Sequence, residues 1–151
     1  MELRVHEESV EYFLSSLRSL REHNEKKRKV IMASIEITKQ NFEDTIKDGI
    51  VLLDFWDSWC GPCSQFVPIF EIISEAHPDI KFGKVNTEEQ PAIAGSFGIT
   101  AIPTLAAFRD NILIFQQAGA LNGAAREDLI SKIRELDMDK VRAEIADQEA
   151  K

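Results

Sequence analysis

The chain has 151 residues, of which 44% are hydrophobic and 29% are charged, and its formal net charge at pH 7 is -8. This length suits one globular domain with a single buried core. The negative charge argues against non-specific nucleic-acid binding, because the phosphates would be repelled. Two cysteines are too few for a disulfide-dense secreted scaffold, and no stretch reaches the ~18 apolar residues of a membrane span. We therefore expect a cytoplasmic protein whose partners are other proteins.

The first 31 residues differ in charge from the rest of the chain. They carry seven Lys or Arg and six Glu, a balance of +1, which leaves -9 for residues 32–151. Their apolar residues recur at helical spacing, at Val10, Phe13, Leu14, Leu17 and Leu20. Residues 1–31 are therefore predicted to form an amphipathic helical extension, which precedes a domain spanning residues 32–136.

Within this domain, strands and helices are predicted to alternate. Strands are expected over residues 34–37, 50–56, 81–85, 103–108 and 112–117. The first helix is expected to be capped by Thr38 and to run through Phe42 and Ile46 to a stop near Gly49. Further helices are expected over residues 60–76, 91–97 and 124–136. An acidic amphipathic tail, residues 137–151, follows the last helix. The order predicts an α/β fold with a central mixed β-sheet flanked by helices.

The two cysteines, Cys60 and Cys63, lie three residues apart at the start of the helix predicted over residues 60–76. One helical turn places both sulfur atoms on one face, within reach of a disulfide, whose Cα atoms are typically ~5.5 Å apart. Cys60 is nearest the helix N-terminus, where free N–H groups and the helix dipole favour a thiolate. Cys60 is therefore the predicted nucleophile, and Cys63 is the predicted resolving thiol.

Two other uses of the pair are disfavoured. A zinc site needs further ligands, and the scattered His6, His23 and His77 supply no second pair at metal-ligand spacing. A purely structural bridge across so short a loop would constrain little of the unfolded chain. Reversible thiol–disulfide exchange, with no metal, is the favoured interpretation.

The stretch DFWDSWCGPC, followed by FGKVNTEEQP, GITAIPTLAAF and QAGAL at the expected intervals, resembles the thioredoxin family over about residues 33–136. The resemblance implies the thioredoxin fold and dithiol–disulfide exchange with protein substrates. It also implies a monomer with no bound cofactor beyond the redox-active Cys60–Cys63 disulfide. A thioredoxin reductase would return this disulfide to the dithiol with electrons from NADPH.

The same resemblance implies roles for residues around the pair. Asp54, a carboxylate inside an apolar strand, is expected to take the proton of Cys63 through water, with Lys84 as its charge partner. Pro103 is expected to follow a cis peptide bond and to leave the Ile102 backbone free to pair with an extended substrate. The resemblance assigns the remaining substrate contacts to Trp59, Gly61, Pro62, Gly119 and Ala120.

Two positions near the cysteines depart from the family pattern. Asp57 stands where a small neutral residue is usual, and Ser64 stands where many relatives have Lys or Arg. Both changes make the surroundings of Cys60 more negative, so we expect a higher Cys60 pKa than in relatives with Ala and Lys there. Two further functions stay open: a thiol oxidase or isomerase, and a binding or chaperone module whose redox activity is secondary.

Overall fold

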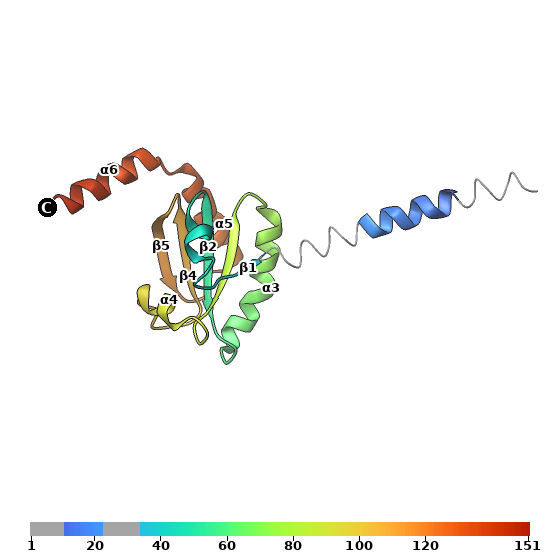
Figure 1. Cartoon of the computed structure of the whole chain (residues 1–151), viewed down its shortest axis with the longest axis horizontal. Coiled ribbons are helices and arrows are strands. Elements are labelled where there is room, and N and C mark those ends of the chain that lie inside the picture. Colours follow the sequence, from blue (N-terminus) through green and yellow to red (C-terminus); the bar gives the residue numbers. More distant parts are fainter. Residues whose placement is uncertain (1–10, 23–33) are drawn as a thin grey trace, which may run out of the picture.

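The computed structural model describes residues 11–22 and 34–151 of the chain (Figure 1). Residues 11–22 are helical, which confirms a helix in the N-terminal extension. The large apolar side chains of this helix are exposed: Tyr12, Phe13, Leu14, Leu17 and Leu20. The rest of the extension, including Val10, lies outside the described residues.

Five strands form one sheet in the order β1-β3-β2-β4-β5. They are β1 (Ser34–Glu36), β2 (Ile50–Trp56), β3 (Lys81–Asn86), β4 (Thr104–Arg109) and β5 (Ile112–Ala118). Strands β1 and β2 pair with β3 in parallel, whereas β4 is antiparallel to both β2 and β5. The sheet is therefore mixed, as predicted, and its boundaries differ from the predicted ones by a residue or so.

Five helices accompany the sheet in residues 34–151 (Figure 1). They are α2 (Phe42–Ile46), α3 (Gly61–Ala76), α4 (Pro91–Ser96), α5 (Gly123–Glu135) and α6 (Met138–Glu149). The predicted tail is thus helical, with Asp137 as N-cap of α6 and Met138 buried. The division of the chain into extension, domain and tail stays a prediction.

The side chains of β2 alternate between two hydrophobic cores, one on each face of the sheet. Leu52 joins the core formed with α3 and α5, which includes Phe66 and Ile130. Leu53 joins the opposite core, to which α2 and α4 contribute. Asp54 follows two residues after Leu52, so its carboxyl group lies on the α3 and α5 side of the sheet. The alternation of side chains along β2 therefore places the carboxyl group of Asp54 in a hydrophobic core.

The predicted cap of the first helix of the domain is wrong. Asn41, not Thr38, occupies the N-cap of α2. The Asn41 side chain accepts a hydrogen bond from the Thr38 N–H at 2.8 Å and donates one to the Glu36 carbonyl at 2.8 Å. These bonds hold residues 38–41 in a turn, so α2 begins at Phe42.

Candidate active site

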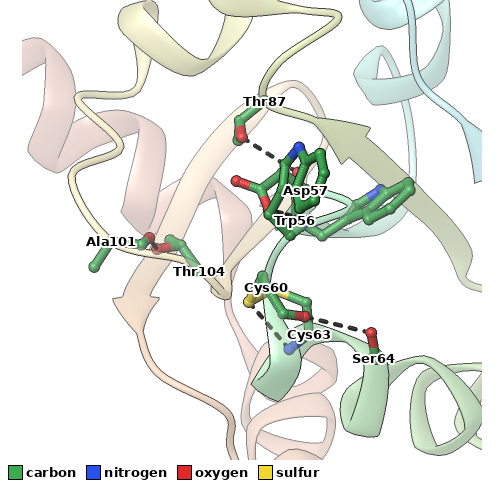
Figure 2. The surroundings of a disulfide bond; sticks show 9 residues. Trp56, Asp57, Cys60, Cys63, Ser64, Thr87, Ala101 and Thr104 are labelled. Atoms are coloured by element: carbon green, nitrogen blue, oxygen red, sulfur yellow. Dashed lines mark hydrogen bonds between the residues drawn. A yellow bond between two sulfur atoms is a disulfide. The ribbon is translucent and has the colours of Figure 1, made fainter.

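The two cysteines lie between the end of β2 and the first turn of α3, where they form a disulfide (Figure 2). Their Cα atoms are 5.2 Å apart. Cys60 is the N-cap of α3, and its sulfur accepts a hydrogen bond from the Cys63 N–H at 3.1 Å. Cys60 is partly exposed, whereas Cys63 is 1% exposed. Cys60 is therefore the more accessible of the two cysteines.

The helix N-terminus gives the Cys60 sulfur a favourable electrostatic environment. The N–H groups of the first turn have no partner within the helix, and one of them points at this sulfur. In the reduced protein such a donor and the helix dipole stabilise a thiolate over a thiol. Cys63, buried one turn further along, lacks this advantage. The two cysteines of the disulfide are thus chemically unequal as thiols once the protein is reduced.

A short turn before Cys60 is held by Asp57. Its Oδ1 accepts a hydrogen bond from the Trp59 N–H at 2.9 Å, and its carbonyl accepts one from the Cys60 N–H at 3.4 Å. Trp59 is 85% exposed, and Gly61 and Pro62 are exposed beside it. The turn therefore presents one large apolar ring next to the reachable sulfur.

The Asp57 carboxylate is expected to raise the pKa of the reduced Cys60 thiol, because its negative charge opposes that of the thiolate. Asp57→Ala should therefore lower this pKa, by a few tenths of a unit because the site is open to solvent. Titrating the ultraviolet absorbance of the thiolate in both proteins measures the change. An unchanged or higher pKa in the variant would contradict the expectation. Ser64→Ala is a matched control, since it removes no charge.

A second chain segment borders the site at the start of β4. The Ile102–Pro103 peptide bond is cis, and Pro103 is buried. The Thr104 hydroxyl donates to the Ala101 carbonyl at 2.6 Å (Figure 2). The Gly119 N–H donates to the Pro103 carbonyl at 2.8 Å. Gly119 has φ of 97°, which favours glycine. The exposed residues 119 and 120 are thereby tied to the cis-proline loop.

A hollow of about 230 Å³ adjoins this loop. Its lining comes from four places in the chain: Asp57, Thr87, Ala94 and residues 99–102. Trp56 lies beside it, where its carbonyl accepts hydrogen bonds from the Thr87 N–H at 2.8 Å and hydroxyl at 3.3 Å. Ile102, predicted to contact substrate, is partly exposed within this lining.

Asp54 is completely buried on β2, the middle strand of the sheet. Neither of its carboxyl oxygens has a hydrogen-bond partner among the residues that the structure describes. Burial raises the pKa of Asp54 to about 7, and the positive charges of Lys84 and Arg126 oppose this rise. The group therefore changes its protonation state near neutral pH.

Lys84 is close to Asp54 but binds another carboxylate. The two residues are register partners on β2 and β3. The Lys84 ammonium, however, lies 2.7 Å from Glu71 Oε1 on α3, an oxygen that also accepts a hydrogen bond from the Ser34 hydroxyl. Lys84 thus acts on Asp54 through its charge, without a direct ion pair. Glu71 is absent from the residues predicted from the sequence, because nothing local marks it.

Arg126 on α5 is the second residue that was not predicted. It is 2% exposed, and its guanidinium carbon lies 4.1 Å from the centroid of the Phe66 ring. Arg126, Ile130 and Ile133 are the buried residues of α5. Their spacing of four and three residues is that of one helical face. In the sequence, an arginine at a position of the apolar face of a helix is the feature that could have marked Arg126 as buried.

Within residues 11–22 and 34–151, no cluster of three or more His, Cys, Asp or Glu could hold a metal ion. Over those same ranges, every helix falls short of the length and apolarity needed to cross a membrane. His77 instead accepts a hydrogen bond from Arg134 at 3.2 Å and binds Glu127 at 2.9 Å.

A redox-active cysteine pair at a helix N-terminus, on a mixed sheet beside a cis-proline, defines a thiol–disulfide oxidoreductase. Comparison with known proteins agrees, since the family model for Thioredoxin matches residues 33–135. The chain belongs to the thioredoxin family.

Individual relatives support this assignment. A Streptomyces coelicolor protein assigned as thioredoxin 2 is 51% identical over 119 residues, which cover 78% of this chain and 89% of that protein. Bacillus subtilis thioredoxin is 33% identical, over 67% of this chain and 98% of its own length. Among solved structures, a mutant thioredoxin from Halobacterium salinarum has a TM-score of 0.64 at 29% identity, covering 69% of this chain and 93% of that one.

The protein is therefore a protein-disulfide oxidoreductase, and its redox centre is the Cys60–Cys63 pair. As in other thioredoxins, no bound cofactor takes part, because the two sulfur atoms themselves carry the electrons. Its partners are, in general terms, a reductase and proteins that contain disulfides.

Proposed function

We propose that the protein works as a cytoplasmic, monomeric reductant of protein disulfides, with Cys60 as nucleophile, Cys63 as resolving thiol and Asp54 as proton acceptor. The observation that carries the assignment of the cysteines is their unequal exposure. Cys60 is reachable at the N-terminus of α3, whereas Cys63 is 1% exposed one turn along the same helix.

The proposed reaction transfers two electrons to the substrate. The Cys60 thiolate attacks one sulfur of a substrate disulfide, and the other substrate sulfur leaves as a thiolate. The resulting mixed disulfide is then attacked by the Cys63 thiolate at the Cys60 sulfur. This step forms the Cys60–Cys63 disulfide and releases the second substrate thiolate. The released thiolates take protons from solvent, and the protein is left oxidised by two electrons.

Asp54 suits the proton transfer in the second attack. Cys63 attacks as a thiolate, so its thiol must first lose a proton. A carboxyl group with a pKa of about 7 accepts that proton and later releases it at neutral pH. Because both Asp54 oxygens lack protein partners, they are free to receive the proton, through water as expected from the sequence. Lys84 is the proposed charge partner at a distance.

The proposed substrate surface surrounds the Cys60 sulfur. The Ile102 backbone would pair with an extended substrate chain, since the residue precedes the buried Pro103 and is itself partly exposed. The remaining contacts are proposed for exposed residues of two loops: Trp59, Gly61, Pro62, Gly119 and Ala120. The negative net charge of -8 supports protein rather than nucleic-acid substrates.

Reduction of insulin disulfides, coupled to a thioredoxin reductase and NADPH, tests this function. We expect NADPH oxidation that depends on both the protein and insulin. A Cys60→Ser variant serves as the control and should leave only the background rate. Absence of turnover with a competent reductase would contradict the proposal. A reduction potential as high as that of protein disulfide isomerases would instead favour an oxidase or isomerase.

A further inference from the structure

Arg126 is a buried cation that the thiol exchange described above does not use. It is 2% exposed, although charged side chains are rarely buried without a partner. Among the residues that the structure describes, none of the ion pairs includes Arg126. Its position therefore needs another explanation.

The contacts of Arg126 connect the core to the substrate surface. Its Nη2 donates to the carbonyl of Leu121, which follows the proposed substrate residues Gly119 and Ala120. Its guanidinium stacks over Phe66, a residue of α3 that lies one turn after Cys63. The Nε and Nη1 atoms are buried and have no hydrogen-bond partner within residues 11–22 and 34–151. Two donors thus lie unused in the core between α3, α5 and the sheet.

Asp54 borders the same region. It lies on the face of β2 that carries Leu52, and Leu52 shares a core with Phe66. Both Asp54 oxygens are buried without partners, as are the two Arg126 nitrogens. The two groups therefore have complementary charge and complementary unused hydrogen-bonding atoms. Burial lowers the pKa of Arg126, and the charge of Asp54 opposes this effect.

The other groups around Asp54 leave Arg126 as its least compensated cation. On β3, Lys84 is paired with Glu71 of α3 at 2.7 Å, so a carboxylate already offsets its charge. On β4, the register partner of Asp54 is the apolar Leu105. Of the helices that cover this face of the sheet, α3 carries Cys63 and Glu71, and α5 carries Arg126.

We propose that Arg126 is a positioning residue for the resolving step, whose guanidinium favours the Asp54 carboxylate and so keeps it able to accept the proton of Cys63 at neutral pH. The proton passes from the Cys63 thiol to Asp54, and Arg126 stays protonated throughout. This inference rests on the proposed role of Asp54. It deepens that role by naming a second positive charge, besides that of Lys84, that favours the Asp54 carboxylate.

The test is a titration of the Asp54 carboxyl carbon by ¹³C NMR in the oxidised full-length protein. Arg126→Met keeps an apolar stem over Phe66 and removes the charge, so the Asp54 midpoint should rise by about one pH unit. Arg126→Lys keeps the charge and should restore the midpoint most of the way. Arg126→Gln is a second neutral variant in case Met disturbs folding.

Arg109→Met is the matched control. Arg109 also donates to backbone carbonyls of the α5 region, those of Ile133 and Leu136 at 2.6 and 2.8 Å. It lies at the far end of β4, paired with Ile50 rather than with Asp54. Its loss should leave the Asp54 titration unchanged. An equal shift in this control would mean a general loss of packing and would overturn the inference.

The pH profile of insulin reduction separates failure of this inference from failure of the proposed function. In Arg126→Met the rising limb should move to higher pH with the Asp54 midpoint, and in an Asp54→Asn background the same substitution should not move it. An unmoved Asp54 midpoint in the folded variant would overturn the inference while leaving the role of Asp54 intact. A moved midpoint with an unmoved profile would overturn the role of Asp54 and the inference with it.

Discussion

Replacement of Cys63 by serine is expected to convert the protein into a covalent trap for its substrates. Cys60 keeps its place at the N-terminus of α3 and still attacks a substrate disulfide. The mixed disulfide then persists, because the buried hydroxyl at position 63 cannot attack a sulfur as a thiolate does. Turnover of insulin should fall to the uncatalysed background. Non-reducing electrophoresis should show an adduct with the substrate that dithiothreitol reverses.

The reciprocal variant provides the control for this trap. Cys60→Ser should neither turn over nor form the adduct, since the remaining thiol at position 63 is 1% exposed and out of reach of a protein substrate. If Cys60→Ser formed the adduct as readily as Cys63→Ser, the two thiols would be equivalent. Their assignment as nucleophile and resolving thiol would then be wrong.

Removal of the Asp54 carboxyl is expected to change how stability depends on pH. The pKa of Asp54 is raised from 3.8 to about 7 in the folded protein, so over this interval the folded state holds a proton that the unfolded state has released. Wild-type stability therefore falls as the pH rises from about 4 through about 7. At 1.36 kcal/mol per unit, a rise of about three units corresponds to a loss of up to about 4 kcal/mol.

Asp54→Asn should lack this loss. The free energy of unfolding of the oxidised variant, relative to wild type, should therefore increase by up to about 4 kcal/mol between about pH 4 and about pH 8. Urea denaturation of both proteins at several pH values measures the difference. Parallel stability curves for the two proteins would contradict a raised pKa in the folded state.

The exposed carboxylate of Asp48 is expected to affect the pH dependence of stability in the opposite direction to Asp54. Asp48 is paired with Lys81 at 2.9 Å, and this hydrogen bond and charge lower its pKa from 3.8. A lowered pKa adds stability above 3.8 that is lost as the pH falls through the folded value. Asp48→Asn should therefore show a small trend in the opposite direction to Asp54→Asn.

Much of this protein follows from its sequence alone, because the signals involved are local. The almost continuously apolar run of residues 50–56 predicts β2 with its observed boundaries. The spacing of Cys60 and Cys63 predicts a disulfide across one helical turn, since three residues and one turn fix the separation of the sulfur atoms. The same run places one carboxylate, Asp54, inside the sheet, so its burial is also readable from strand periodicity.

Only the tertiary structure decides which charges act on that carboxylate. Lys84 is paired with the carboxylate of Glu71, which lies on another element. The same Glu71 oxygen accepts a hydrogen bond from the hydroxyl of Ser34, which is 37 residues away from Glu71 in the sequence. Arg126 reaches Phe66 across the packing of two helices. Such contacts depend on how the helices and strands pack against one another, and this packing cannot be predicted from the spacing of residues in the sequence. The redox pair could therefore be predicted from the sequence, whereas the electrostatic setting of its proton acceptor required the folded chain.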